Sequence, residues 1–372
     1  MDREFDIAIV GGGIAGSAIG YGLAKAGRRV VIVDGSDHGL RASRTNHGLI
    51  WIQGKGANCP PYQRVTRLSS RLWPSFAAEL QDLTGIDLEY RPSGGLNFCV
   101  SEAQFEAQRA LAERMVGSHP DYEVEICERS RLENMLPGIR LGPKVCGASF
   151  SPMDGHVNPL LTLRALLDGF VRSGGTLVTG EMVSAITPAD GAYRLTTNSR
   201  AIAAERVVLA AGNESTELAA SLDLPLTLVP QRGQLLVTER VEPVFPFAAS
   251  GLRQNATGTF QLGFTNENVG RSVDVTLSGG NSIANRALNI MPDLGKLRVV
   301  RHWAGLRVLT PDGVPIYDRS RTHPGVFVAA CHSAVTLAAF HAGPLADWLS
   351  DGGPVGHYQD FSGSRFDVGA TA

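Results

Sequence analysis

The first 34 residues constrain the fold more than any other part of the chain. Runs of β-branched and small apolar residues at 5–10 and 29–33 are typical of strands buried on both faces. Between them lie a glycine-rich turn at 11–16 and a helix of small residues at 17–26. A strand, a tight turn, a helix and a second strand within about 30 residues form a complete supersecondary unit. The sequence therefore predicts an α/β domain that opens with this unit.

The glycine spacing of this unit is that of a dinucleotide-binding loop. Gly11, Gly13 and Gly16 follow the order GxGxxG, and Asp34 ends the second strand. The first glycine permits the tight turn, the second lets the backbone approach a diphosphate, and the third lets the helix pack closely with its N-terminus toward the anion. The acid hydrogen-bonds ribose hydroxyls. The residues expected to contact the dinucleotide here are Gly11, Gly13, Ile14, Ala15, Gly16, Asp34 and Gly35.

The rest of the chain favours FAD over NAD as the cofactor. An NAD-binding domain continues into further strand–helix repeats, whereas residues 35–58 are polar and glycine-rich and predict an irregular loop. A meander at 182–204 leads to a strand at 207–212, and the last strand, at 326–330, and its helix, at 334–349, come only at the C-terminal end. Because the glycine motif alone does not decide, NAD stays open as the alternative.

The middle of the chain alternates between helical and strand-like patterns. Apolar residues at helical spacing predict helices over 62–83, 102–116, 129–136 and 160–173. Strand patterns dominate 88–100 and 232–320. Since dinucleotide-type strands stand at both ends of the chain, we expect the first domain to be discontinuous in sequence.

Composition excludes several classes of protein. With 34 Lys+Arg against 36 Asp+Glu, the chain lacks the basic footprint of a nucleic-acid binder. None of the five cysteines forms a CxxC pair, so we expect no zinc or iron–sulfur site held by this chain alone, and their scatter predicts reduced thiols and a cytoplasmic location. No apolar run reaches the ~18 residues of a transmembrane helix, and no signal peptide is predicted.

Further motifs carry a resemblance to a known family. They are Asp154–Pro159 (DGHVNP), Leu209–Gly212 (LAAG), Trp303–Arg307 (WAGLR), Thr310–Pro315 (TPDGVP) and the Cys331-His332 turn. With the N-terminal unit, they make nearly the whole chain resemble the D-amino-acid oxidase and glycine oxidase-like FAD-dependent oxidoreductases. Within that family, Thr45–Gly56 and Cys331–Ala338 look most like the FAD (beta) subunits of opine (octopine or nopaline) oxidases and of hydrogen cyanide synthase.

The resemblance implies a fold. It is an α/β fold in which a discontinuous, Rossmann-like FAD-binding domain of the glutathione-reductase type is joined to an α+β substrate domain with an antiparallel sheet. We expect the FAD-binding domain to comprise residues 1–55, 156–225 and 325–372. The substrate-binding domain would comprise residues 56–155 and 226–324.

The resemblance also implies a reaction. A hydride would pass from the carbon next to the nitrogen of an amino acid or an opine-like secondary amine to flavin N5, giving an imine that hydrolyses to a 2-oxo acid and an amine. A second redox subunit carrying further cofactors is the implied partner, and through such partners the complex could lie at the inner membrane. Two alternatives stay open: a stand-alone glycine or D-amino-acid oxidase that uses oxygen, and a non-catalytic dinucleotide-binding subunit.

Arg307 is the candidate catalytic residue. Oxidation of an amino acid requires a cation that holds the carboxylate, and the planar fork of arginine does so through two parallel hydrogen bonds. Arg307 lies among apolar residues and matches the family's carboxylate-binding arginine, although Val308 follows where the family often has proline. Trp303 and His47 are the other substrate-binding candidates. The alternative for an isolated arginine is a solvated surface group.

The remaining candidates are expected to contact the flavin cofactor. Reduced flavin gains negative charge at N1 and O2, where a helix N-terminus stabilises it. We assign this role to the backbone of Ser333, Ala334, Val335 and Thr336. The other expected contacts are Ser43 and Arg44 at the diphosphate, Asn46, His47, Gly48 and Leu49 along the ring, Val183 at the adenine, and Ala211 and Gly212. For His47, covalent attachment or a structural loop stays open; Cys331 is expected to be a buried structural thiol, with a nucleophile or flavin attachment point as the alternative.

Overall fold

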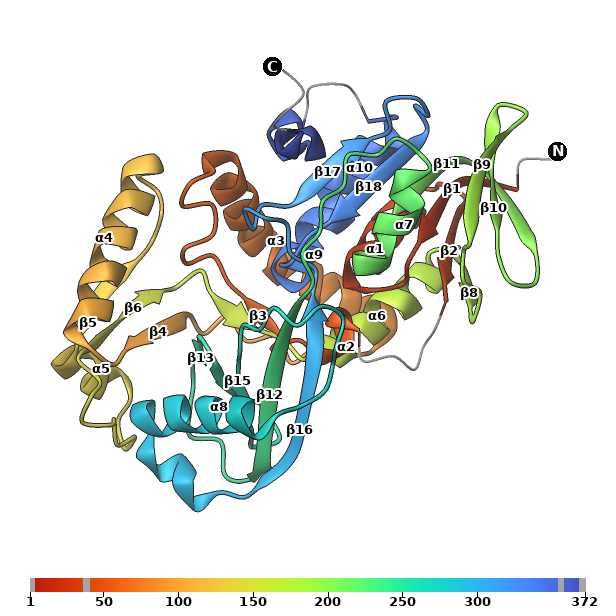
Figure 1. The fold of residues 1–372 in the computed structure, drawn as a ribbon. Coiled ribbons are helices and arrows are strands. Elements are labelled where there is room, and N and C mark those ends of the chain that lie inside the picture. The colour runs from red at the N-terminus through yellow and green to blue at the C-terminus, as the bar shows by residue number, and fades with distance from the viewer. Residues whose placement is uncertain (1–3, 36–40, 354–357, 368–372) are drawn as a thin grey trace.

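The computed structural model describes residues 4–35, 41–353 and 358–367, and its two large sheets are shown in Figure 1. The first sheet, at the upper right of that view, has eight strands. Along its main path they are β17 (Ile316–Arg319), β18 (Val326–Ala330), β11 (Ala201–Leu209), β1 (Phe5–Val10), β2 (Val30–Asp34) and β8 (Thr176–Thr179). The hairpin of β9 (Ala185–Ala189) and β10 (Ala192–Thr196) extends it from β11. From β18 to β8 the strands are parallel, and β17 is an antiparallel edge strand.

Alternate side chains of β1 reach two separate cores, because successive residues of a strand point to opposite faces of the sheet. Ile7 and Ile9 pack against helices on one face, and Ala8 and Val10 pack on the other. The helices that supply the first core are α1 (Ile14–Lys25), α3 (Pro60–Thr84), α6 (Pro159–Arg172), α9 (Ala334–Phe340) and α10 (Ala346–Ser350). The short helix α7 (Ser215–Ala220) contributes to the second core. This double burial explains the continuous apolar runs of the strands.

The second sheet also has eight strands and is antiparallel except for one pair. In order they are β16 (Val299–Arg307), β12 (Gln231–Arg240), β15 (Thr259–Gly263), β14 (Leu252–Gln254), β13 (Ala248–Ala249), β4 (Gly95–Cys99), β6 (Gly147–Ser151) and β5 (Glu125–Glu128). The helices near it are α4 (Glu102–Ser118), α5 (Arg129–Met135) and α8 (Leu277–Ile290). The expected fold class, a mixed α/β fold with a second antiparallel sheet, is confirmed.

Three short elements belong to neither large sheet. They are α2 (Ala42–Thr45) and the two-stranded sheet of β3 (Leu49–Ile50) and β7 (Gly155–His156). The prediction of an irregular loop over 35–58 missed α2 and β3, which are too short to show a period. Residues 36–40 of that loop lie outside the described residues.

The strand-like patterns noted over 232–320 did not reveal α8, which lies within that segment. Ile283, Ala287 and Ile290 are buried at helical spacing on one side of this helix. Thr276 caps its start, because the Thr276 side chain accepts a hydrogen bond from the backbone N–H of Gly279. The helix predicted over 334–349 is interrupted by a π-helical turn at His341–Leu345, which contains a proline.

Two elements also depart from the expected domain limits. β17 lies within 226–324, which we assigned to the substrate-binding domain, yet it pairs with β18 in the first sheet. Helix α3 lies within 56–155, yet its Trp73 and Leu80 belong to the core beneath the first sheet. Both follow from burial, because each element finds its apolar partner in that core. The remaining domain boundaries stay a proposal.

Within the described residues, no helix combines the length and the apolar character that crossing a membrane requires. The same residues contain no group of three or more His, Cys, Asp or Glu side chains placed to hold a metal ion.

Candidate active site

A cavity of 290 Å³ lies where the carboxyl ends of β1 and β2 meet the N-terminus of α1. We call it the cradle cavity. Gly13, the N-cap of α1, has no side chain to cap this end; the Ser43 side chain accepts a hydrogen bond from the N–H of Ile14, and the other free backbone N–H groups of the first turn face the cavity. Together with the helix dipole they favour an anion. The cations Arg41 and Arg44 also line the cradle cavity.

Three glycines of the loop before and within the first turn of α1 leave no room for a side chain. A Cβ on Gly16 would lie 2.0 Å from the carbonyl oxygen of Gly11, and one on Gly13 would lie 2.9 Å from Oγ of Ser43. Gly11 has φ +110°, and its Cβ would lie 2.7 Å from the carbonyl oxygen of Ala210. Without these side chains, the helix start approaches the strands closely and leaves its N–H groups open to a bound diphosphate.

Asp34 and Ser43 hold the glycine loop in place. Oδ2 of Asp34 accepts a hydrogen bond of 2.6 Å from the N–H of Gly12, and Oδ1 lies 3.1 Å from Nη1 of Arg41. Oγ of Ser43 accepts a hydrogen bond of 2.9 Å from the N–H of Ile14. The two polar side chains therefore shape the turn in addition to lining the cavity.

A second cavity of 360 Å³ adjoins the first, and we call it the reaction cavity. Six residues line both cavities: Ala42, Asn46, Leu306, Val308, His332 and Val335. Its walls come from the loop 45–49, from β12 and β16 of the second sheet, and from the start of α9. A dinucleotide held in the cradle cavity can thus extend directly into the reaction cavity.

Arg307 is half-buried and lines the reaction cavity. Its Nη2 donates to the carbonyl oxygen of Thr265 at 2.8 Å, its Nη1 donates to Oε1 of Gln231 at 3.1 Å, and its guanidinium carbon lies 4.9 Å from the ring centre of Phe264. Burial lowers the pKa of Arg307 to about 10, so the group stays charged at neutral pH. Among the described residues, no carboxylate lies within ion-pair distance of it.

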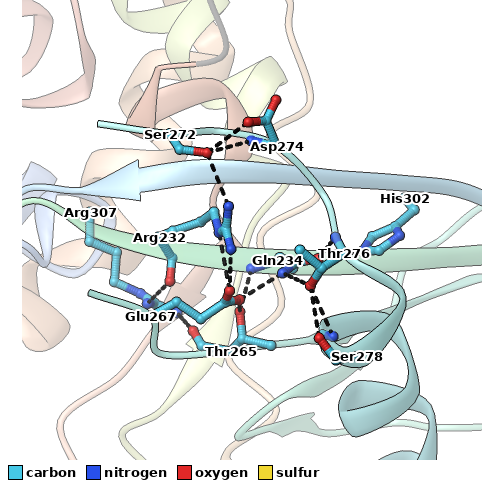
Figure 2. A network of polar contacts seen from close by, with 11 residues as sticks. Arg232, Gln234, Thr265, Glu267, Ser272, Asp274, Thr276, Ser278, His302 and Arg307 are labelled. Carbon is cyan, nitrogen blue, oxygen red and sulfur yellow. Dashed lines mark hydrogen bonds and ion pairs between the residues drawn. The ribbon is translucent and has the colours of Figure 1, made fainter. Parts of the chain in front are cut away.

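A network around Glu267 fixes the surroundings of Arg307 (Figure 2). The Glu267 carboxylate accepts hydrogen bonds from the side chains of Arg232, Thr265 and Gln234, the last at 2.7 Å. Burial acts to raise the pKa of Glu267, but these hydrogen bonds and the charge of Arg232 outweigh it and lower the pKa. Glu267 forms its ion pair with Arg232 and acts on Arg307 only through its charge, so the Arg307 guanidinium stays available to a ligand.

His47 is a buried imidazole at the reaction cavity. Its side chain is 8% exposed, and neither ring nitrogen finds a hydrogen-bond partner among the described residues. Burial lowers the pKa of His47 well below its usual value, and the charges of Arg253 and His156 lower it further. A neutral imidazole offers one donor and one acceptor, which the site leaves for a ligand.

Lys55 is a functional candidate that our sequence reasoning did not single out. It lines the reaction cavity, and its Nζ donates to Oγ of Ser333 at 2.5 Å and to Oγ1 of Thr336 at 3.1 Å. The sequence offered one hint: lysine is rare in this chain, with four in all, and Lys55 stands between two glycines. Its partners are 278 and 281 residues away along the chain, which no local pattern reveals.

Most of the predicted site residues line one or both cavities. The cradle cavity receives Gly11, Gly13, Ile14, Ala15, Asp34, Ser43, Arg44, Ala211, Gly212 and Ala334. The reaction cavity receives His47, Gly48, Leu49, Arg307, Ser333 and Thr336. Asn46 and Val335 line both.

Four predicted residues line neither cavity: Gly16, Gly35, Val183 and Trp303. A Cβ on Gly35 would pack on Met182, and Val183 is buried in the core on the second face of the first sheet. The indole Nε1–H of Trp303 donates a hydrogen bond of 3.4 Å to the carbonyl oxygen of Thr45. These residues pack within the protein.

Cys331 lines the cradle cavity but is 7% exposed. Burial raises the pKa of its thiol to about 12. Because the thiolate is the reactive form, this pKa favours a structural thiol over a nucleophile.

Comparisons with known proteins agree on one family. The family described as FAD dependent oxidoreductase (DAO) matches residues 6–348. An opine oxidase subunit of Agrobacterium tumefaciens is 39% identical over 367 residues, covering 98% of each chain. Hydrogen cyanide synthase subunit HcnC of Pseudomonas protegens is 26% identical, covering 85% of each chain. The crystal structure of glycine oxidase from Geobacillus kaustophilus has a TM-score of 0.90 at 26% identity, covering 98% of this chain and 99% of the other.

These matches confirm the resemblance read from the motifs, and with it FAD as the cofactor in place of NAD. The family match extends over nearly the whole chain and includes both cavities and the strand that carries Arg307. The chain belongs to the DAO family of FAD-dependent oxidoreductases.

Proposed function

We propose that this protein oxidises an amino acid or an N-substituted amino acid at the carbon next to nitrogen. The observation that carries the proposal is Arg307, a charged guanidinium that lines a cavity adjoining a dinucleotide cradle and has no carboxylate partner among the described residues. The relatives named as an opine oxidase subunit and as glycine oxidase support it, since both names denote oxidation of such compounds. An opine, in which two amino-acid parts share a secondary nitrogen, is our first choice of substrate.

The residues of the two cavities fit FAD. The N-terminus of α1 would hold the diphosphate and Asp34 a ribose, and the backbone of Val183 would meet the adenine, as predicted from the sequence. The loop at 46–49 and the start of α9 would hold the flavin ring, with the ring nitrogens of His47 as free hydrogen-bonding groups. When bound, FAD supplies the acceptor for the two electrons of the oxidation.

Arg307 would bind the substrate carboxylate through its guanidinium fork. Its bonds to Thr265 and Gln231 and its stacking on Phe264 fix the plane of that fork before substrate arrives, so little conformational entropy is lost on binding. Apolar Leu235 and Val308 also line the cavity, which keeps the carbon next to nitrogen in a dry environment.

The amine substrate would lose a hydride from carbon, for which bound FAD would be the acceptor, and a proton from nitrogen, which would pass to solvent, and it would become an imine. Water then adds to the imine carbon, and the C–N bond breaks to give a 2-oxo acid and an amine. The two electrons leave to an acceptor in a later step.

We propose that the chain acts as the FAD subunit of a multi-subunit dehydrogenase. The word subunit in the name of a relative that is 39% identical over 98% of both chains supports this arrangement. A partner carrying further redox cofactors would then pass the electrons to a carrier. The likeness to glycine oxidase favours one alternative, a stand-alone oxidase that passes electrons to oxygen.

The test is anaerobic mixing of the FAD-loaded protein with glycine, D-amino acids, octopine and nopaline. We expect the visible absorbance of the oxidised flavin to fall with an opine and less, or not at all, with the others. Dithionite provides the control for full reduction. If dithionite reduces the flavin and no amine in the panel does, the proposal is wrong. Dependence of turnover on added oxygen alone would favour the stand-alone oxidase.

A further inference from the structure

Lys55 is a half-buried cation beside the start of α9, where the predicted flavin contacts lie. Among the described residues, the ammonium of Lys55 bonds only to the hydroxyls of Ser333 and Thr336, and the Ser333 hydroxyl also lies 3.1 Å from the hydroxyl of Tyr62. Hydroxyl groups are neutral, so this shell orients the ammonium without cancelling its charge. A buried charge without a counter-charge costs free energy, which a bound anion recovers.

The Asp154 carboxylate acts on Lys55 through its charge, which opposes the lowering of the Lys55 pKa by burial, but it makes no ion pair with Lys55. The Asp154 carboxylate is committed elsewhere: it accepts hydrogen bonds from the N–H of Ile52 at 2.6 Å and from Nε2 of Gln53 at 2.7 Å. In the part of the chain that the structure describes, no carboxylate lies within ion-pair distance of Lys55. The charge of Lys55 therefore has no ion-pair partner among the described residues on the side that faces the reaction cavity.

Lys55 and Arg307 are the two charged side chains of the reaction cavity, and no Asp or Glu of the described residues lines it. Burial lowers the pKa of His332 to about 3, and the charges of Lys55 and Arg307 lower it further. His47 and His332 are thus neutral. The described lining, with two positive side chains and no negative one, therefore gives the cavity a positive charge.

FAD does not supply the missing anions. Its diphosphate belongs in the cradle cavity, whose lining contains neither Lys55 nor Arg307. The oxidised flavin ring, which is the form present when the substrate binds, carries no net charge; the negative charge of the reduced ring at Ser333–Thr336 arises only after the hydride has been transferred. The substrate is the remaining source of negative charge, and a simple amino acid brings one carboxylate, which leaves Lys55 without a partner.

We propose that Lys55 binds a second carboxylate of the substrate, so that the enzyme selects secondary amines that carry a carboxylate on each side of the nitrogen. This inference rests on the proposed function. Arg307 holds the carboxylate attached to the carbon that is oxidised, and Lys55 holds the carboxylate of the other half. A substrate with two carboxylates and a neutral amine brings one negative group for each of the two cations, which complements the cavity.

The test compares two amines that differ by one carboxylate, N-(1-carboxyethyl)alanine and N-ethylalanine, in anaerobic reduction of the FAD-loaded protein. We expect wild type to be half-saturated at a concentration of the dicarboxylate about tenfold or more below that of N-ethylalanine. Lys55→Met is expected to remove this difference by weakening the dicarboxylate alone. Lys55→Arg is expected to keep part of the preference, because it keeps the charge.

Lys144→Met is the matched control, since Lys144 is exposed and lines neither cavity, and it is expected to change the reduction by neither amine. The flavin content and the visible spectrum of each variant check that it folds and binds FAD. Equal weakening of both amines in Lys55→Met, or an equal loss of their limiting reduction rates, would show that Lys55 serves the flavin or the fold and would overturn the inference.

A binding measurement separates this inference from the proposed function. Glutarate and butyrate are unreactive acids with two carboxylates and one, and each is titrated while the flavin spectrum is followed. Tighter binding of glutarate, lost in Lys55→Met, supports the second carboxylate site even if no amine is oxidised. Equal binding of the two acids in wild type contradicts it even if amines are oxidised.

Discussion

At the scale of single residues, the arrangement around Arg307 shows why lysine cannot replace it. The guanidinium uses Thr265 and Gln231 to set its plane, and only a planar fork can then meet a carboxylate with two parallel hydrogen bonds. We expect Arg307→Lys to lower kcat/KM about 10- to 100-fold, because lysine loses one charged hydrogen bond to the carboxylate and the fixed geometry of the fork. The measurement is the rate of anaerobic flavin reduction against amine concentration.

The control for this prediction is Arg298→Lys, an exposed arginine paired with Glu239, which is expected to leave the rate unchanged. Unchanged reduction by Arg307→Lys and by Arg307→Ala would mean that the chain does not bind the carboxylate here. That result would favour a non-catalytic dinucleotide-binding subunit.

Lys55 gives the substrate preference a pH dependence. Burial lowers the pKa of Lys55 to about 8, against the opposing effects of Asp154 and Cys331; the other titratable groups beside it are Tyr62 and His332. Below that pH the ammonium is charged, and above it the charge is lost. We therefore expect the ratio of kcat/KM for the dicarboxylate to that for N-ethylalanine to fall as the pH rises from about 7 to about 9.

The ratio is the right measurement because the titration of the substrate amine affects both compounds and largely cancels. In Lys55→Met the ratio is expected to be low and independent of pH. A wild-type ratio that stays constant over this range would contradict the role of Lys55.

At the scale of elements, the glycine loop and α1 form the part of the site that tolerates least change. A methyl group at position 16 would overlap the carbonyl oxygen of Gly11, so either α1 or the loop must move. We expect Gly16→Ala to lower the flavin-to-protein ratio severely and to destabilise the protein. Gly117→Ala is the matched helical control, because its Cβ meets no atom within 4 Å and alanine favours a helix by up to about 1 kcal/mol.

The measurement is flavin absorbance per protein after gel filtration, together with the melting temperature. A Gly16→Ala protein with full flavin content would show that the helix start is not where the diphosphate binds. Loss of flavin in Gly117→Ala as well would show that the assay reports general instability.

Elements differed in how well the sequence predicted them. The unit from β1 to β2 was predictable because its strands are buried on both faces and its glycines have fixed steric roles. Helix α8 was missed because its first turn contains exposed Leu277 and two glycines, which blur the helical period. Its start depends on tertiary contacts: Nε2 of Gln234 donates to Oγ1 of Thr276 at 2.9 Å from 42 residues away.

The candidate site was predicted in outline for the same reason. Asp34 and Arg307 stand in recognisable motifs, so the sequence could propose them, and each lines a cavity. Lys55 contacts side chains at the start of α9 that are distant in sequence, and the free nitrogens of His47 become visible only once burial and neighbours are known. Charge complementarity of the reaction cavity is likewise a property of the folded chain, not of any segment.

At the scale of the whole molecule, the reaction cavity joins the two large sheets. β12 and β16 of the second sheet supply one wall, and the start of α9, which follows β18 of the first sheet, supplies another. The contact between β16 and α2 is close, since a Cβ on Gly305 would lie 1.9 Å from Oγ1 of Thr45. A cofactor that fills both cavities therefore contacts both sheets, and its binding should couple their unfolding.

Calorimetry of the FAD-free protein, with and without added FAD, tests this coupling. A ligand at 100 times its Kd stabilises the folded state by about 2.7 kcal/mol. Because FAD bound in both cavities would contact both sheets, we expect one cooperative transition that moves upward as a whole. Riboflavin is the control: it lacks the diphosphate and ribose that we propose the cradle cavity holds, so it is expected to produce a smaller shift. Two separate transitions, of which FAD moves only one, would contradict the bridging arrangement and show that the sheets unfold independently.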